Sequence, residues 1–195
     1  SCSNGAFTPT LEYVNMFPMS DGAPFDWNNP ALVTKIHTDR DPRLYETILV
    51  DGAEYKGRQA ELWVGGREAL ASSKSEDGQF ATGYANYKYI LDFEKNKSKP
   101  TMWPYLRVAE LYLIYAEALM VNEKYDEAIA QVDAVRARVG LKGLAVSNPT
   151  LNLHDKAVLK NEILRERACE LGLEDVRLFD LIRNKMEINF TAPLH

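Results

Sequence analysis

The feature that most constrains the fold is an almost uninterrupted apolar stretch at residues 105–121. Only Arg107, Glu110 and Glu117 interrupt it. At roughly 100° per residue, these three side chains fall within one stripe of an α-helix. A helix that is apolar on nearly all sides is typical of a protein interior, so we expect this helix to be buried.

A second helix is expected directly after the first. Residues 122–124 (Asn-Glu-Lys) predict a turn, and the segment that follows runs to Gly140. Its apolar side chains recur at helical spacing, at Tyr125, Ala128, Ile129, Val132 and Val135. The pair is similar to one tetratricopeptide unit, a helix-turn-helix of about 34 residues in which small side chains let the helices approach. A single unit cannot cover its own apolar faces, so other helices must pack on it.

Residues 160–183 predict two more helices that separate near Gly172. Together with the hairpin they contain four ordered motifs. These are Leu106-Arg107-x-Ala109-Glu110-x-Tyr112-Leu113-x-Tyr115-Ala116-Glu117-Ala118, Val135-Arg136-x-Arg138-x-Gly140-Leu141, Glu166-Arg167-x-x-Glu170-Leu171 and Glu174-x-x-Arg177-x-x-Asp180-Leu181-x-Arg183. Upstream, Asp41-Pro42-Arg43 is a further landmark. In these motifs the chain resembles the C-terminal part of the SusD/RagB family, the cell-surface glycan-binding lipoproteins of Bacteroidetes.

We therefore expect a mainly α fold, with a tetratricopeptide-like hairpin packed on further helices, long loops and at most a small β-hairpin. Residues 1–195 are expected to form a single domain, the C-terminal part of a SusD-like protein. Within it, residues 1–102 would be a loop-rich layer and residues 103–186 a helical core. No apolar signal segment precedes Cys2, so Cys2 is not expected to be the family's lipid anchor.

The resemblance also implies a function. It implies non-catalytic binding of an oligosaccharide or polysaccharide at the bacterial outer membrane, exposed at the cell surface. The ligand would pass to a TonB-dependent, SusC-like transporter. Contact with the membrane would come only through a lipid anchor outside this chain. The alternative from another class is a helical-repeat scaffold that binds protein or peptide, and a glycoside hydrolase is less favoured.

The first hundred residues predict short elements joined by loops. Thr8-Pro9 and Asn29-Pro30 each have the character of a helix start, and the second helix would run to about Thr38. Residues 44–50 and 58–64 predict the strands of a small hairpin. Loops are expected at 65–83 and 142–153.

Composition and motifs exclude several classes of function. The net charge of −5 comes without any basic block, so nucleic acid is not an expected partner. No nucleotide-binding loop, hydrolase motif or metal-binding spacing occurs, and we expect no cofactor, metal or catalytic residue. Asp39-x-Asp41 lacks the rest of a calcium-binding loop. Cys2 and Cys169 have no reason to pair, and Cys169 is expected to be a buried free thiol.

Carboxylates are plentiful, and a glycosidase needs only two that face each other across a sugar. The regularly spaced acids, however, lie beside arginines on predicted helices, which favours structural ion pairs. The acids are Glu110, Glu117, Glu166, Glu170 and Glu174, and the arginines are Arg107, Arg136, Arg167 and Arg177.

Sugar binding requires exposed aromatic rings that stack on pyranose C–H faces, with polar side chains for the hydroxyl groups. Two loop segments offer both, and the candidate ligand-binding residues are Phe25, Trp27, Asn28, Arg58 and Trp63. The alternative is that these aromatics only cover the helical core. Trp103, beside Pro104, is expected to be a packing residue. Exposed coplanar aromatic rings would favour glycan binding. An apolar groove would favour peptide binding, and two acids that face each other in a cleft would favour hydrolysis.

Overall fold

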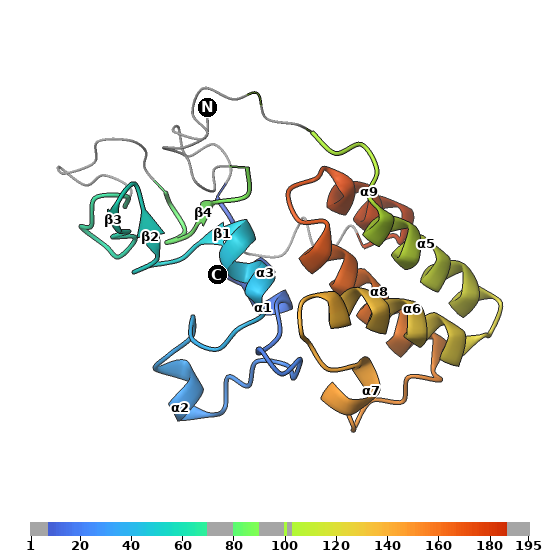
Figure 1. Cartoon of the computed structure of the whole chain (residues 1–195). Coiled ribbons are helices and arrows are strands. Elements are labelled where there is room, and N and C mark those ends of the chain that lie inside the picture. The colour runs from blue at the N-terminus through green and yellow to red at the C-terminus, as the bar shows by residue number, and fades with distance from the viewer. Residues whose placement is uncertain (1–7, 70–79, 90–99, 101–102, 187–195) are drawn as a thin grey trace. The chain divides into compact units, whose positions relative to one another are not determined.

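The computed structural model describes residues 8–69, 80–89, 100 and 103–186 (Figure 1). The chain divides into two compact units. The first unit consists of residues 1–14, 44–102 and 194–195, and the second of residues 15–43 and 103–193. Helices dominate and the strands are short, so the predicted mainly α fold is confirmed. That the units form a single domain stays a prediction.

The second unit contains the predicted helical hairpin. Helix α5 (Val108–Val121) and helix α6 (Tyr125–Arg138) are joined by a turn in which Glu123 has a positive φ of 62°. Helix α8 (Lys156–Glu170) packs against both, and helix α9 (Val176–Arg183) follows after the expected break (Figure 1). The hairpin and the further helices packed on it are therefore confirmed.

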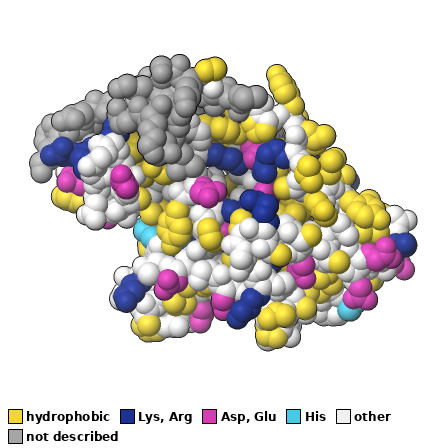
Figure 2. All heavy atoms as spheres, in the orientation of Figure 1, with side chains coloured by type: hydrophobic (Ala, Val, Ile, Leu, Met, Phe, Trp, Pro, Cys, Tyr) yellow, Lys and Arg dark blue, Asp and Glu magenta, His cyan; other side chains and the backbone are white. Residues whose placement is uncertain are grey.

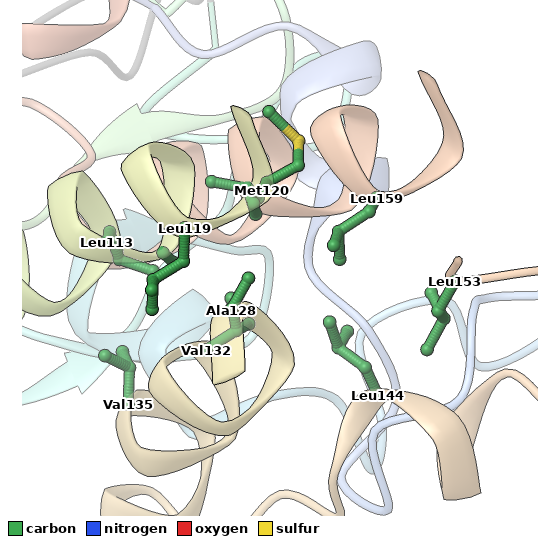
Figure 3. Close-up of a cluster of buried hydrophobic side chains, with 11 residues drawn as sticks. Leu113, Leu119, Met120, Ala128, Val132, Val135, Leu144, Leu153 and Leu159 are labelled. Atoms are coloured by element: carbon green, nitrogen blue, oxygen red, sulfur yellow. The ribbon is translucent and has the colours of Figure 1, made fainter. Parts of the chain in front are cut away.

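The core of this unit lies between α5, α6 and α8. Its apolar side chains point toward one another from all three helices and from the segment that joins α6 to α8 (Figure 3). They are Leu113, Ala116, Leu119, Met120, Ala128, Val132, Val135, Leu144, Leu153, Leu159 and Ile163. Ala128 is completely buried, so its methyl group occupies the space that the tetratricopeptide pattern assigns to a small residue.

The expectation that the first hairpin helix is buried on all sides was wrong. Along α5, one side faces α6 and α8, while the other leaves large apolar side chains exposed among the described residues (Figure 2). The exposed side chains are Val108, Leu111, Tyr112, Ile114, Tyr115 and Val121. An apolar sequence indicates that a surface is suited to be covered, but it does not specify what covers it.

Short helices begin and end at other places than the sequence predicts. Helix α1 (Leu11–Met16) starts after Thr10, whose Oγ1 accepts the Tyr13 N–H at 3.3 Å, and not at Thr8. Helix α2 (Pro30–Val33) has the predicted Asn29 cap but ends before Thr38. Helix α7 (Leu144–Ser147) lies within the predicted loop at 142–153, because Asp133 Oδ1 accepts the Leu144 N–H at 2.7 Å.

The prediction that residues 44–50 and 58–64 form the two paired strands of a hairpin was wrong. Asp41 Oδ1 accepts the Arg43 N–H at 2.9 Å, and helix α3 (Pro42–Thr47) starts there in place of a strand. Strand β1 (Ile48–Leu49) pairs antiparallel with strand β4 (Ala85–Asn86).

The small hairpin of the first unit forms elsewhere. Strand β2 (Glu54–Tyr55) pairs with strand β3 (Arg58–Gln59) across Lys56-Gly57, and both turn residues have the positive φ that such a turn requires. One cluster of buried apolar side chains in this unit consists of Leu49, Ala60, Leu62, Phe80 and Ala85. In neither unit is any described helix both long and apolar enough to cross a bilayer.

Candidate functional site

The loop that carries Phe25, Trp27 and Asn28 belongs to the second unit and is closed at its base. Met19 and Arg40 form an antiparallel bridge, and the Ser20 N–H donates to Asp39 O at 2.7 Å. Arg40 is buried, and its guanidinium donates to the carbonyl groups of Phe17 at 2.6 Å and Ile36 at 2.7 Å. One cation thus holds both ends of the loop together.

The same loop is attached to the helical core. Arg136 of α6 is completely buried and donates from Nη2 to Gly22 O at 3.1 Å. Gly22 has a φ of +92°, and a Cβ atom there would lie 2.5 Å from Arg136 Nη2 and from Ser147 Oγ. Only glycine satisfies both the backbone angle and the close approach.

The loop carries a pair of aromatic rings, of which Phe25 is half-buried and Trp27 is exposed. The rings of Phe25 and Trp27 have centroids 5.0 Å apart and an interplanar angle of 65°, which is an edge-to-face arrangement. Arg40 Cζ lies 4.5 Å from the Phe25 ring centroid, within cation–π range. Trp27 is 43% exposed. A ligand could therefore stack on the exposed indole of Trp27, but the two rings of the pair are not coplanar and do not form one stacking surface.

Polar groups flank the indole. Asp26 Oδ1 accepts the Asn28 N–H at 2.9 Å, and Asn29 Oδ1 accepts the Ala31 N–H at 3.1 Å, which starts helix α2. These local hydrogen bonds fix the backbone on either side of Trp27. The side chains of Asp26 and Asn28 are exposed, so a carboxylate and an amide accompany the ring. A carboxylate accepts hydrogen bonds and an amide both donates and accepts them, which is the chemistry that hydroxyl groups require.

The second candidate segment belongs to the first unit. Trp63 is 53% exposed and Val64 is 95% exposed, and a turn closes behind them through the Gly66 N–H, which donates to Trp63 O at 2.8 Å. Gly66 is required there, because a Cβ atom would lie 2.2 Å from Glu61 O. The turn holds two apolar side chains in solvent.

Arg58 is engaged in an ion pair with the buried Glu68. Its Nη1 donates to Glu68 Oε2 at 3.2 Å and its Nη2 donates to Glu68 Oε1. Burial raises the pKa of Glu68, but hydrogen bonds from Arg58 and the Glu61 N–H outweigh it and lower the pKa below its ordinary value. Binding of a ligand by Arg58 stays a prediction, and it would compete with this pair.

The five candidate residues fall in two units, and each set is described by itself. Phe25, Trp27 and Asn28 lie on one loop of the second unit, whereas Arg58 and Trp63 belong to the first. Trp103, expected to pack, is 43% exposed and also leaves aromatic surface in solvent. Sequence reasoning missed Arg40, the residue that closes the Trp27 loop, because nothing near it in the sequence marks that role.

The acids and arginines of the helical motifs form a buried network. Glu170 accepts hydrogen bonds from Arg43 Nη1 at 3.1 Å, Arg107 Nη1 at 3.0 Å and Arg138 Nη2 at 2.7 Å. Burial raises the pKa of Glu170, but the hydrogen bond from Arg107 and the charges of Arg43 and Arg138 more than compensate and lower it. The carboxylate is therefore held in its charged form.

The network confirms that these acids form ion pairs, with some unexpected partners. Glu166 pairs with Arg43 at 2.5 Å and Arg136 at 3.2 Å. Arg167 Nε donates to Asp180 Oδ2 at 2.8 Å, although Asp180 is not one of the five acids expected to pair with arginines. The predicted buried free thiol is also confirmed at Cys169. Among the described residues, no group of three or more acids, histidines or cysteines could hold a metal ion.

The architecture is that of a helical hairpin protein with an aromatic loop fixed to its core. The sequence matches the SusD family over residues 1–193, and the chain belongs to this family. A SusD-like protein from Bacteroides fragilis has a similar structure, with a TM-score of 0.74, 29% identity and 92% of this chain covered. A SusD-like carbohydrate-binding protein from the same species gives a TM-score of 0.67 at 24% identity over 91% of this chain.

The chain spans only part of the length of these relatives. It covers 36% and 35% of the two solved Bacteroides fragilis proteins. A curated relative, the SusD-like protein P38 of Formosa agariphila, is 32% identical over 91 residues, which is 46% of this chain and 18% of that protein.

Proposed function

We propose that the protein binds an oligosaccharide or polysaccharide through the loop that carries Trp27. The observation that supports this most strongly is an exposed indole on a loop fixed at its base by Arg40 and to the helical core by Arg136. A fixed aromatic ring stacks on a pyranose with little loss of conformational entropy. Asp26 and Asn28 supply polar groups beside it. Family membership and the relative named as carbohydrate-binding support the same ligand class.

We further propose that binding is not followed by hydrolysis. A glycosidase acid needs a raised pKa so that it carries a proton to donate. Arg107, Arg43 and Arg138 do the opposite to Glu170, whose pKa is lowered. Glu166 and Asp180 likewise accept hydrogen bonds from arginines, so these buried acids act as structural partners.

The cellular setting is a proposal that rests on the family alone. The protein would work at the outer membrane, exposed at the cell surface and anchored by a lipid outside this chain. It would deliver its glycan to a SusC-like, TonB-dependent transporter.

A second candidate function is a scaffold that binds protein or peptide. The observation that favours it is the exposed apolar side of α5, where Leu111, Ile114 and Tyr115 lie in solvent. An exposed apolar patch of this kind is typical of an interface.

The test of the glycan proposal is migration through gels that contain different polysaccharides. Retardation by one polysaccharide identifies the ligand, and Trp27→Ala is then expected to weaken binding about fivefold or more, because an aromatic stacking contact contributes about 1 kcal/mol. Tyr105→Ala is the matched control, because Tyr105 is an exposed aromatic residue outside the loop. Retention of full binding by Trp27→Ala would reject this loop as the site.

A further inference from the structure

Asp26, the residue before Trp27, has its carboxylate held in place on the loop. Asp26 Oδ1 accepts the Asn28 N–H at 2.9 Å, and Asp26 O accepts the Asn29 N–H at 3.2 Å. The two hydrogen bonds close a turn in which Trp27 is the second residue. A carboxylate that bonds to its own turn in this way does not swing freely, so it stays near the backbone that carries the indole.

The charge of this carboxylate acts on a ligand of Trp27. Neighbouring Cα atoms are about 3.8 Å apart, whereas the field of an exposed charge extends over about 8 Å at physiological salt. Asp26 is exposed, as Trp27 is, so both side chains are open to a ligand from solvent. A sugar stacked on the indole therefore lies within range of one fixed negative charge.

The other charges of the loop do not compensate for this one. Residues 19–40 contain three exposed carboxylates and one exposed ammonium group. They are those of Asp21, Asp26, Asp39 and Lys35. Arg40 adds a positive charge, but it is 2% exposed, and its guanidinium donates to backbone carbonyl groups. The cation that closes the loop is thus directed inward and is not presented to a ligand.

The second oxygen of Asp26 is open to a hydrogen bond from a ligand. In the part of the chain that the structure describes, no group donates to Oδ2. A carboxylate only accepts hydrogen bonds, and a bond from a hydroxyl group to it is stronger than one between neutral groups. A sugar hydroxyl group supplies the donor, whereas a uronate or a sulfate ester presents only acceptors at the same place. Hydrogen bonding and charge therefore favour the same kind of sugar.

We propose that the Trp27 loop selects glycans that carry no negative groups, and that Asp26 is the residue that determines this selection. Oδ2 accepts a hydrogen bond from a sugar hydroxyl group, while the carboxylate repels uronate and sulfate groups. The inference rests on the proposed glycan function of this loop and narrows its ligand class to neutral polysaccharides.

Elementary electrostatics gives the size of the effect. Two unit charges of like sign about 4 Å apart in water repel each other by about 1 kcal/mol, which corresponds to about fivefold in affinity. A neutral hydroxyl group at the same place gains a charge-assisted hydrogen bond instead. An acidic sugar is therefore expected to bind at least about fivefold more weakly than its neutral counterpart.

The test compares matched polysaccharides in affinity gels. Amylopectin, laminarin and galactomannan are each run beside the form whose primary hydroxyl groups have been oxidised to carboxylates, and methyl-esterified polygalacturonate is run beside polygalacturonate. Retardation is expected from a neutral member, with at least about fivefold weaker binding to its acidic counterpart. Salt at about 1 M shortens the screening length to about 3 Å and should narrow the difference within the pair.

Asp26→Asn tests the role of the residue itself. Asparagine keeps an oxygen that accepts the Asn28 N–H but removes the charge, so the turn is preserved. In this variant the preference for the neutral member is expected to fall about fivefold. Asp155→Asn is the matched control and should keep the full preference. Asp155 Oδ1 likewise accepts a backbone N–H, that of Ala157 at 2.8 Å, but Asp155 lies outside the loop.

Three results would overturn the inference. Equal retardation by both members of a pair, abolished by Trp27→Ala, would leave the glycan proposal intact and reject selection by charge. A preference that neither Asp26→Asn nor salt alters would assign the selection to the shape of the sugar. Absence of retardation by every polysaccharide would reject the glycan proposal and this inference with it.

Discussion

Replacing Glu170 by glutamine is expected to lower the free energy of unfolding by about 3–5 kcal/mol. Glutamine keeps the size of the side chain but removes the charge that three arginines share. Arg43 is 5% exposed and bears most of the effect, because solvent does not reach it to compensate for the lost negative charge. Arg138 is 56% exposed, so its contribution is that of a surface pair, about 0.2–1 kcal/mol. The exposed fraction of the Arg107 side chain lies between those of Arg43 and Arg138, so its contribution is expected to be intermediate.

The measurement is urea unfolding followed by circular dichroism, with Glu127→Gln as the control. Glu127 pairs with Lys124 at 3.3 Å, and both side chains are largely exposed, so this variant is expected to lose about 0–1 kcal/mol. Equal losses for the two variants would show that the network is solvated, and the account of a buried structural ion cluster would be refuted.

The same carboxylate predicts a dependence of stability on pH. The pKa of Glu170 is lower in the folded chain than the ordinary value of 4.5, so its charged form stabilises the fold above that pH. Stability is expected to fall as the pH drops below about 4.5 through the folded pKa. The difference between the original protein and Glu170→Gln should shrink over the same interval, and a constant difference would contradict the assignment.

Three further outcomes are expected. Ala128→Phe should overpack the crossing of α5 and α6 and lower the free energy of unfolding by about 1–3 kcal/mol. Ala130→Phe, on the exposed side of α6, should lower it little. Equal melting temperatures for the two variants would contradict the pairing of α5 with α6. Gly66→Ala should disrupt the turn behind Trp63, since its Cβ atom would meet Glu61 O at 2.2 Å, and unchanged Trp63 fluorescence would argue against this. A protein as long as the relatives should bind the same oligosaccharide more tightly, because ligand sites often form where several parts of a chain converge, and equal affinity would place the whole site in this chain.

The helices could be predicted from the sequence because their signals are local. The spacing of Ala128, Val132 and Val135 is sufficient to define the buried side of α6. The strands could not be predicted in the same way. Strand β1 has only two residues, and its partner β4 lies more than thirty residues further along the chain, so no local pattern marks the pair.

The residues of the candidate site likewise include some that local sequence signals identify and some that only the fold brings together. Trp27 and Asn28 could be named because an aromatic residue beside amides in a loop is visible in the sequence. Arg40 could not, because its role arises only when the loop closes and brings it to Phe25. The ion pair of Arg43 with Glu166 joins residues 123 positions apart, so the motifs identified the participants of the network and the fold decided their partners.

The most direct test of the glycan proposal is the fluorescence of Trp27 during an oligosaccharide titration. Trp63→Phe and Trp103→Phe leave it as the sole tryptophan, because the chain has three. With an oligosaccharide of the polysaccharide selected in the gels, we predict that Trp27 emission shifts and saturates with the affinity measured by calorimetry. Binding heat without any change in Trp27 emission would contradict the proposal that this indole stacks on the sugar.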